Sequence, residues 1–171
     1  MKQKRILLSI AIAQMINAQT YIELGIQSGR TINEMSKYVN NCIGVDINDC
    51  SIHLTDNITF YNMSTDEFIN IWDKSKKIDM VFIDADHSHE SSYRDFINYK
   101  DIVRNDGIIL LHDTYPCNEE YTKPNRCHDT WKTAIKIKQD HSHECEIVTI
   151  PDGCGLSIVR MNRGKHLQWM K

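Results

Sequence analysis

The sequence lacks the features that several broad classes of protein need. No apolar run reaches the roughly 18 residues of a membrane-spanning helix. Positive charge is not in excess, because 20 Lys and Arg stand against 23 Asp and Glu, for a net charge of −3. With 7 Gly and 3 Pro, the composition is not that of a collagen-like repeat. We therefore expect neither a multi-span membrane protein nor a fibrous one, and neither a nucleic-acid nor a membrane partner.

The cysteine pattern also excludes a scaffold held by disulfides. None of the 6 cysteines forms a C-x-x-C pair, and a chain of 171 residues with 41% apolar side chains has enough material for a core without disulfides. The spacing of Cys117, Cys127 and His128 matches no closed zinc site. We predict free thiols in a reducing compartment, hence a cytoplasmic protein, and a single domain over residues 1–171.

The N-terminus allows two interpretations. Basic residues precede the apolar run 6–13, which ends in a sequence of the signal-peptidase type, Ala11-Ile12-Ala13. The same segment has helical spacing of its apolar residues, at Ile6, Ile10, Ala13 and Ile16. Because a predicted strand begins at residue 21, cleavage after Ala13 would leave only a few residues before that strand. We favour a first helix, with a signal peptide as the alternative.

The rest of the chain alternates between strand-like and helix-like segments. Strands are predicted over 21–25, 42–47, 58–62, 78–83, 107–111, 144–150 and 156–161, and helices over 31–39, 65–74, 88–104 and 130–139. Turn-forming residues join the last two strands. This order predicts an α/β fold, a doubly wound and mostly parallel seven-stranded sheet with a closing antiparallel hairpin. Ligands of such sheets bind beyond the carboxyl ends of the strands.

The first of these strand ends carries a glycine-containing turn. Glu23-Leu-Gly-Ile-Gln-Ser-Gly29 places glycines four residues apart, which lets a backbone turn approach a ligand and open a helix. Asp46 ends the second strand, where a carboxylate can accept the hydroxyls of a ribose. The dinucleotide motif G-x-G-x-x-G is absent. These residues predict a nucleoside-binding site.

Acidic and histidine side chains follow the fourth and fifth strands. Asp84-Ala-Asp86-His87 ends the fourth strand, and His112-Asp113-Thr114 ends the fifth. Carboxylate oxygens suit Mg²⁺, Mn²⁺ or Ca²⁺. We expect Asp84 and Asp113 to converge across neighbouring strand ends. Asp86 precedes a predicted helix, and we assign it mainly to capping that helix.

The glycine turn and Asp46 resemble motif I and the acidic loop of class I S-adenosylmethionine (SAM)-dependent methyltransferases, and the resemblance covers nearly the whole chain. The fold implied is the Rossmann-like methyltransferase fold. Many members have Gly where Gln27 stands and Asp where Met63 stands. The cofactor-binding residues that the resemblance implies are Glu23, Gly25, Ile26, Gln27, Ser28, Gly29, Asp46, Ile47, Met63, Ser64 and Asp84.

The Asp84–His87 segment is similar to that of small metal-dependent O-methyltransferases of the catechol and caffeoyl-CoA type, and of the macrocin and cephalosporin-hydroxylase type. The first group implies a divalent metal, expected to be Mg²⁺, held by Asp84, Asp113 and Thr114, although the residue at Thr114 is usually Asn there. In the second group an acidic residue stands at His112, which makes His112 an alternative ligand. His87 occupies the place of a catalytic Lys, so His87 and Asp84 are the candidate catalytic residues.

The expected reaction is methyl transfer from SAM to a hydroxyl group of a small molecule or a sugar. Two other functions stay open: a metal-dependent glycosyltransferase using Asp84-x-Asp86, and a SAM-binding module without catalysis. The polar segment 114–129 is expected to form a substrate rim or lid. The sequence leaves open whether the chain forms a homo-oligomer.

Overall fold

The computed structural model describes residues 2–163 of the chain. Its strands are β1 (Thr20–Leu24), β2 (Asn41–Asp46), β3 (Ile58–Asn62), β4 (Ile78–Ile83), β5 (Val103–His112), β6 (Cys145–Ile150) and β7 (Leu156–Met161). Its helices are α1 (Lys2–Met15), α2 (Arg30–Met35), α3 (Thr65–Ile71), α4 (His89–Lys100) and α5 (Trp131–Asp140), with short 3₁₀ turns η1 (Ser51–His53) and η2 (Glu119–Thr122).

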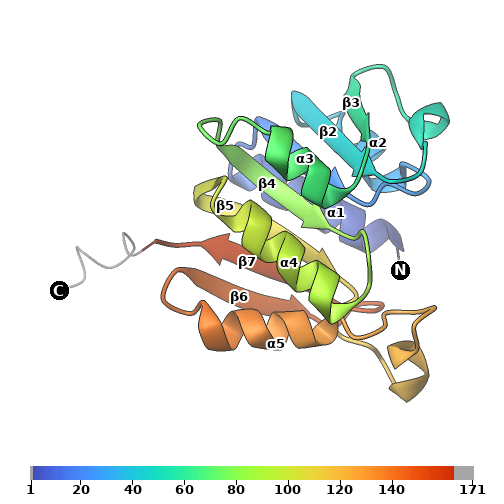
Figure 1. The fold of residues 1–171 in the computed structure, drawn as a ribbon, viewed down its shortest axis with the longest axis vertical. Coiled ribbons are helices and arrows are strands. Elements are labelled where there is room, and N and C mark those ends of the chain that lie inside the picture. The colour runs from blue at the N-terminus through green and yellow to red at the C-terminus, as the bar shows by residue number, and fades with distance from the viewer. Residues whose placement is uncertain (1, 164–171) are drawn as a thin grey trace.

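The strands form one seven-stranded sheet in the order β3-β2-β1-β4-β5-β7-β6 (Figure 1). β1 to β5 pair in parallel, while β7 lies antiparallel between β5 and β6. Parallel strands need crossover connections, and helices supply them between most neighbours. The predicted doubly wound sheet with a closing antiparallel hairpin is therefore confirmed.

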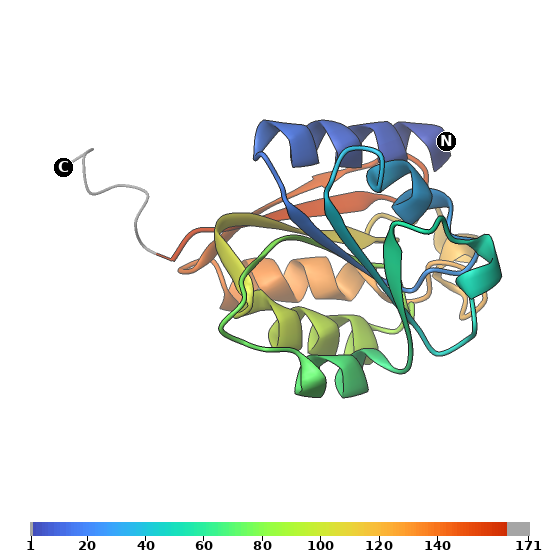
Figure 2. The same cartoon turned by 90° about the horizontal axis from the view of Figure 1, so that it is seen from above.

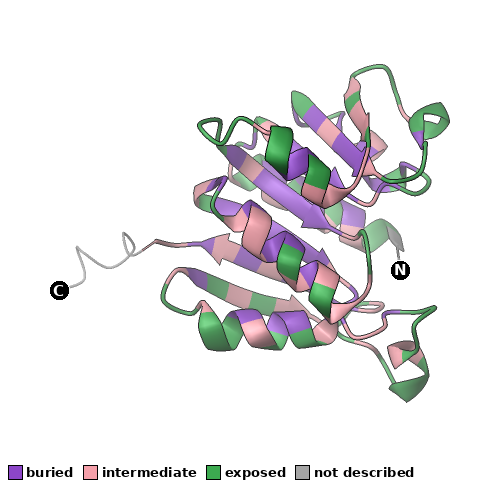
Figure 3. Ribbon diagram, in the orientation of Figure 1, coloured by how far each residue is buried: buried purple, intermediate pink, exposed green. Residues whose placement is uncertain are grey.

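Helices cover both faces of this sheet. α1 and α2 lie on one face, and α3, α4 and α5 lie on the other (Figure 2). Each face encloses its own apolar core: Ile22, Val81 and Ile109 pack under α3 to α5, and Tyr21, Met80 and Phe82 pack under α1 and α2. The alternation follows from the pleat, which sends successive side chains to opposite faces. Figure 3 shows the central strands as the buried layer.

The N-terminal segment forms the predicted helix. Ile6, Ile10 and Ala13 of α1 are buried against the sheet, at the helical spacing seen in the sequence. Among residues 2–163, no helix is both long enough and apolar enough to cross a membrane.

The predicted boundary between α4 and β5 is wrong. The helix ends at Lys100 instead of residue 104, and β5 begins at Val103 instead of residue 107. The β4–β5 register shifts between Ile78 and Met80, and Asp106, with φ of +64°, lies in the extra length of β5. Ile102 and Val103 are buried in the core, so burial of these β-branched side chains is favoured over continuation of the helix.

Two other predicted helices are shorter than expected. α3 ends at Ile71, since Asp73 Oδ1 accepts hydrogen bonds from the Ser75 backbone and hydroxyl and forms a turn. α2 ends at Met35, and a series of turns continues to Val39. These changes do not alter the order of elements.

The sheet order reverses between β1 and β4. The chain passes from β1 outward to β2 and β3, and then returns to the other side of β1 to form β4. The connections that follow β1 and β4 therefore leave in opposite directions and open a crevice at their carboxyl ends. The predicted site residues follow these strands and their neighbours.

Candidate active site

A cleft of about 860 Å³ lies at the carboxyl ends of the parallel strands. It is lined by ten of the predicted cofactor-binding residues: Glu23, Gly25, Ile26, Gln27, Ser28, Asp46, Ile47, Met63, Ser64 and Asp84. Asp113, His112 and His87 line the same cleft. The tertiary structure thus brings residues from five parts of the chain to one surface.

The turn after β1 is shaped by its glycines. Gly25 has φ of +88°, and a Cβ there would lie 2.3 Å from the Asp84 carbonyl oxygen. Only glycine combines this backbone conformation with so close an approach. Gly29, the eleventh predicted cofactor residue, does not line the cleft; with φ of +67° it precedes α2 as its N-cap. The two glycines hold the β1 turn against β4 and start α2.

Asp46 holds the same turn from the end of β2. Its Oδ2 accepts hydrogen bonds from the backbone N–H groups of Ile26 at 2.8 Å and Gln27 at 3.1 Å, and its Oδ1 accepts one from Asn48 N at 2.8 Å. Burial by itself would raise the pKa of the Asp46 carboxyl, but these backbone donors outweigh burial and hold that pKa below its usual value. Asp46 is therefore an ionised acceptor that also orders the glycine turn.

Glu23 is buried beneath the turn, with 3% of its surface exposed. The Tyr21 hydroxyl donates a hydrogen bond to its Oε2 at 2.7 Å. Burial, with a smaller contribution from the negative charge of Asp84, raises the pKa of the Glu23 carboxyl to about 8 despite that hydrogen bond. At neutral pH this side chain carries a proton.

Asp84 and Asp113 converge across the ends of β4 and β5, as predicted. His112 Nδ1 lies 3.0 Å from Asp84 Oδ1 and 3.1 Å from Asp113 Oδ1. Burial would raise the pKa of the Asp84 carboxyl, but the charge and hydrogen bond of His112, together with Arg5 and His87, outweigh burial and lower it. Three basic side chains, His112, Arg5 and His87, thus lie around the Asp84 carboxylate.

His87 completes this group. Its Nδ1 lies 2.6 Å from the Arg126 carbonyl oxygen and 3.1 Å from Asp113 Oδ2, while its Nε2 lies 3.7 Å from Asp84 Oδ1. A carbonyl oxygen can only accept, so His87 Nδ1 donates the hydrogen in that bond. The other ring nitrogen, Nε2, faces Asp84.

Thr114, which was predicted as the third metal ligand, does not join the carboxylate group in this structure. Its hydroxyl oxygen accepts a hydrogen bond from Ser157 Oγ of β7 at 2.8 Å, and it does not line the cleft. Asp113, with φ of +59°, has a left-handed backbone, and Thr114 after it is buried against β7. The group of close ligand atoms at this point is Asp84, His87 and Asp113 instead.

The prediction that Asp86 caps α4 is wrong, although Asp86 binds the residue that does cap this helix. The two Asp86 oxygens accept from the backbone and the hydroxyl of Ser88, both at 3.1 Å. The N-cap of α4 is Ser88 itself, whose hydroxyl accepts from Ser91 N. Because both Asp86 oxygens bind Ser88, Asp84 and Asp86 do not act as a pair.

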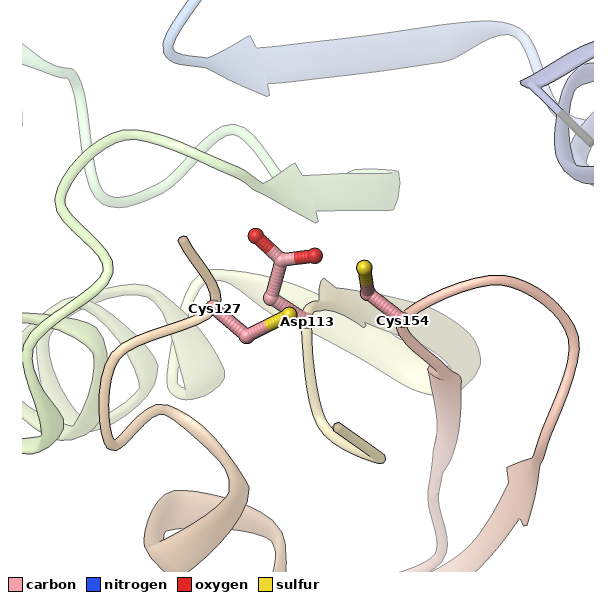
Figure 4. A group of neighbouring side chains, drawn as sticks. All are labelled: Asp113, Cys127 and Cys154. Carbon is pink, nitrogen blue, oxygen red and sulfur yellow. The ribbon is translucent and has the colours of Figure 1, made fainter. Parts of the chain in front are cut away.

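Arg5 and Cys154 were missed by the sequence analysis, which considered Cys127 only together with Cys117 and His128. Arg5 projects from α1, with Nη1 3.6 Å from Asp84 Oδ2 and its guanidinium carbon 5.4 Å from the Phe82 ring centroid. Its buried Nε has no hydrogen-bond partner among the described residues. Cys127 and Cys154 lie beside Asp113 (Figure 4). These contacts join distant segments, and no local pattern in the sequence indicates them.

The segment after β5 forms part of the rim, as predicted. Tyr121, Asn125 and Arg126 line the cleft beside the Asp84–His87–Asp113 group. The cleft thus has two halves, one formed by the glycine turn and Asp46, and one formed by carboxylates, histidines and this rim.

Comparison with known proteins identifies the family. The model of a family described as a methyltransferase domain matches residues 22–114, more than half of the chain. The matched segment runs from within β1 to just after β5 and includes the glycine turn, Asp46 and the Asp84–His87–Asp113 group. The chain therefore belongs to this family of methyltransferase domains. A comparison with curated proteins gave no match.

Solved structures with the same fold include several O-methyltransferases. A candidate caffeoyl-CoA O-methyltransferase from Staphylococcus aureus is 15% identical, with a TM-score of 0.70 over 92% of this chain and 83% of its own. An O-methyltransferase from Bacillus cereus in complex with S-adenosylhomocysteine (SAH) is 12% identical, with a TM-score of 0.70 over 93% and 81%. A third, from Streptomyces achromogenes and in complex with SAM, is 11% identical, with a TM-score of 0.68 over 93% and 80%.

These likenesses show the fold, which is that of class I methyltransferases. Together with the family match, they make the chain a methyltransferase of the class that uses SAM as methyl donor. This confirms the methyltransferase prediction over the glycosyltransferase alternative.

Proposed function

We propose that the protein transfers a methyl group from SAM to a hydroxyl group of a small molecule or a sugar, assisted by a divalent cation. The observation that carries the proposal is the shared cleft. The glycine turn with Asp46 lies in the same cavity as the Asp84–His87–Asp113 group. A methyltransferase must hold donor and acceptor in contact, and the cleft offers a nucleoside-type half beside a half rich in acids and bases.

In the first half, Asp46 would bind the ribose hydroxyls. Its Oδ2 accepts two backbone N–H bonds, whereas its Oδ1 accepts from Asn48 N at 2.8 Å and a longer bond from Asn48 Nδ2 at 3.3 Å. A carboxylate has about four acceptor positions, so Oδ1 keeps room for a ribose hydroxyl if the longer bond yields. Glu23, buried below Gly25, supports the turn at the methionine end.

In the second half, His87 would act as general base. Its Nδ1 hydrogen points to the Arg126 carbonyl and Asp113, which leaves Nε2 to take the proton of an acceptor hydroxyl. Asp113 Oδ2, 3.1 Å from Nδ1, would stabilise the imidazolium that forms. Asp84 orders His112, and Arg5 and His112 balance the carboxylate charge.

The residues also fit a divalent cation. Ligand atoms of Asp84, His87 and Asp113 all lie within 4.8 Å of one another. When bound, a divalent cation lowers the pKa of a coordinated hydroxyl group. The carboxylates of Asp84 and Asp113 suit Mg²⁺ or Mn²⁺, and His87 Nε2 would stay free to act as the base.

Binding of SAH tests the cofactor half. Calorimetric titration of SAH into the wild-type protein is expected to give micromolar binding, and Asp46→Ala should weaken it at least about tenfold, because it removes the ribose acceptor and the bonds that order the turn. Asp49→Ala is the matched control, since Asp49 is exposed, binds Ser51 and does not line the cleft. If the wild-type protein does not bind SAH, the proposal is wrong.

Turnover tests the acceptor half. Methyl transfer to a panel of catechols, phenols and glycosides is expected to fall about 10²-fold or more in His87→Gln, with loss of the acid limb of the pH–rate profile. His128→Gln is the control, because His128 lies near this rim without lining the cleft. SAH binding without turnover of any acceptor would favour a SAM-binding module without catalysis. Activity unchanged in a chelator would refute the role of the cation.

A further inference from the structure

Asp113, Cys127 and Cys154 form a second cluster, which shares Asp113 with the Asp84–His87–Asp113 group. One ligand atom from each side chain lies within 4.8 Å of those of the other two. Figure 4 shows the three side chains coming from three separate segments: the end of β5, the loop before α5, and the turn between β6 and β7. Among the described residues, this is the one such cluster that contains sulphur.

The surrounding backbone holds the three segments together. Tyr115 N donates a hydrogen bond to the Cys154 carbonyl at 2.8 Å, which ties the hairpin turn to the chain just after Asp113. Gly155, with φ of +88°, lets that turn approach so closely that a Cβ would lie 2.3 Å from Tyr115 N. Cys127 N is bound to the Tyr121 carbonyl at 3.0 Å. Asp113 and Cys127 are buried, with 5% and 1% exposed.

The donor set is that of a thiolate metal site. Two cysteine sulphurs and one carboxylate oxygen are ligands that Zn²⁺ takes, and thiolates disfavour Mg²⁺. In a tetrahedral zinc site with Zn–S bonds of about 2.3 Å, the sulphurs lie roughly 3.8 Å apart, within the span of this cluster. All three residues line the cleft, so a fourth position would face the cavity.

We propose that Asp113, Cys127 and Cys154 bind Zn²⁺ through three protein ligands, with the fourth coordination position open to the cleft. The site is distinct from the Asp84–His87–Asp113 group, with which it shares only Asp113. Three protein ligands with an open position are the pattern of zinc sites that bind a water or a substrate oxygen. The proposal concerns metal binding and does not depend on methyl transfer.

Metal titration of the fully reduced, full-length protein tests the site. Zn²⁺ is expected to bind at one equivalent in the presence of millimolar Mg²⁺. Co²⁺ in its place should give the thiolate-to-cobalt charge-transfer band in the near ultraviolet. Cys127→Ser and Cys154→Ser should each weaken Zn²⁺ binding at least about tenfold and reduce that band. Cys145→Ser is the control, because Cys145 is also a buried free cysteine but lies on β6 against the His141 carbonyl.

Two results would overturn the proposal. The first is no Zn²⁺ binding by the reduced protein, and the second is binding that the two serine variants leave unchanged. Circular dichroism verifies that both serine variants fold.

The result is separable from the proposed function. SAH titrations of the same serine variants are expected to match the wild-type protein, because Asp46 and the glycine turn lie in the other half of the cleft. Conversely, Asp46→Ala should keep the cobalt spectrum. If the protein binds no Zn²⁺, SAH binding is still expected. If the protein binds no SAH, the cobalt charge-transfer band is still expected.

Discussion

The buried carboxyl group of Glu23 is expected to make the protein less stable as the pH rises towards neutrality. Its pKa in the folded protein is about 8, against an ordinary value of 4.5. Between these two values the folded chain keeps a proton that the unfolded chain has lost. Unfolding therefore releases a proton in this range, and the free energy of unfolding falls as pH increases.

The size of the effect follows from the shift. Each pH unit between the two pKa values lowers the free energy of unfolding by about 1.4 kcal/mol, so Glu23 should cost about 3 kcal/mol between pH 5 and pH 7.5. Replacing Glu23 by Gln should remove this contribution, because the amide stays neutral and its oxygen can still accept the Tyr21 hydrogen bond. The variant should be more stable than the wild-type protein at pH 7.5 and similar to it at pH 5.

Urea unfolding at pH 5, 6.25 and 7.5, followed by tryptophan fluorescence, measures this difference. The experiment uses the protein without added SAM, because the positive charge of SAM bound near Glu23 would itself lower the pKa of the Glu23 carboxyl. Asp95 is a second buried carboxyl group, whose pKa burial raises to about 7. Asp95→Asn is thus a matched variant, expected to remove a smaller, independent part of the same slope.

One result would refute the reasoning. If Glu23→Gln retains the full pH dependence of the wild-type protein, then Glu23 is ionised in the folded state and its negative charge is stabilised by a group such as Arg5. A variant that is less stable at every pH by the same amount would instead reveal a packing defect.

Two further predictions concern the β1 turn and the start of β1. Gly25→Ala should abolish measurable SAH binding while leaving the circular dichroism spectrum close to wild type, because a Cβ would meet the Asp84 carbonyl at 2.3 Å; unaltered affinity would contradict this close approach of the turn to β4. Asp79→Asn should lower the free energy of unfolding at pH 7 by about 1–3 kcal/mol, because Asp79 Oδ2 accepts from Gln19 N and Thr20 N at 2.8 and 2.9 Å. Burial would raise the pKa of the Asp79 carboxyl, but its hydrogen bonds outweigh burial and lower that pKa, so the stabilisation is present above the usual carboxyl pKa and is lost as the pH falls through the lowered value. In chemical denaturation, the difference in free energy of unfolding between Asp79→Asn and the wild-type protein should therefore disappear at acid pH. A difference that persists there would disprove an ionic origin.

The sequence by itself determined the order of the elements and the place of the cleft. Continuous apolar runs predict β4 and β5 as buried strands, and the glycines at 25 and 29 predict the turn that follows β1. These signals are local, because they arise from short apolar runs and from the backbone freedom of glycine. Asp46, Asp84 and Asp113 could be placed at one edge because parallel strands share their carboxyl ends.

Element boundaries depended on contacts that the local sequence does not contain. Residues 101–104 have apolar spacing that continues the pattern of α4, yet Ile102 and Val103 gain more by packing in the core than by extending the helix. Such competition between helix propensity and burial is decided by tertiary contacts.

The detailed chemistry of the site was decided only by the tertiary structure. Thr114 is bound to Ser157 of β7, Arg5 reaches Asp84 from α1, and Cys154 meets Asp113 from the β6–β7 turn. Each of these contacts joins segments far apart in the chain, so its existence depends on strand order and on how closely the turns pack. The sequence therefore determined which strand ends carry the chemistry, and the packing of the sheet edge decided which side chains meet there.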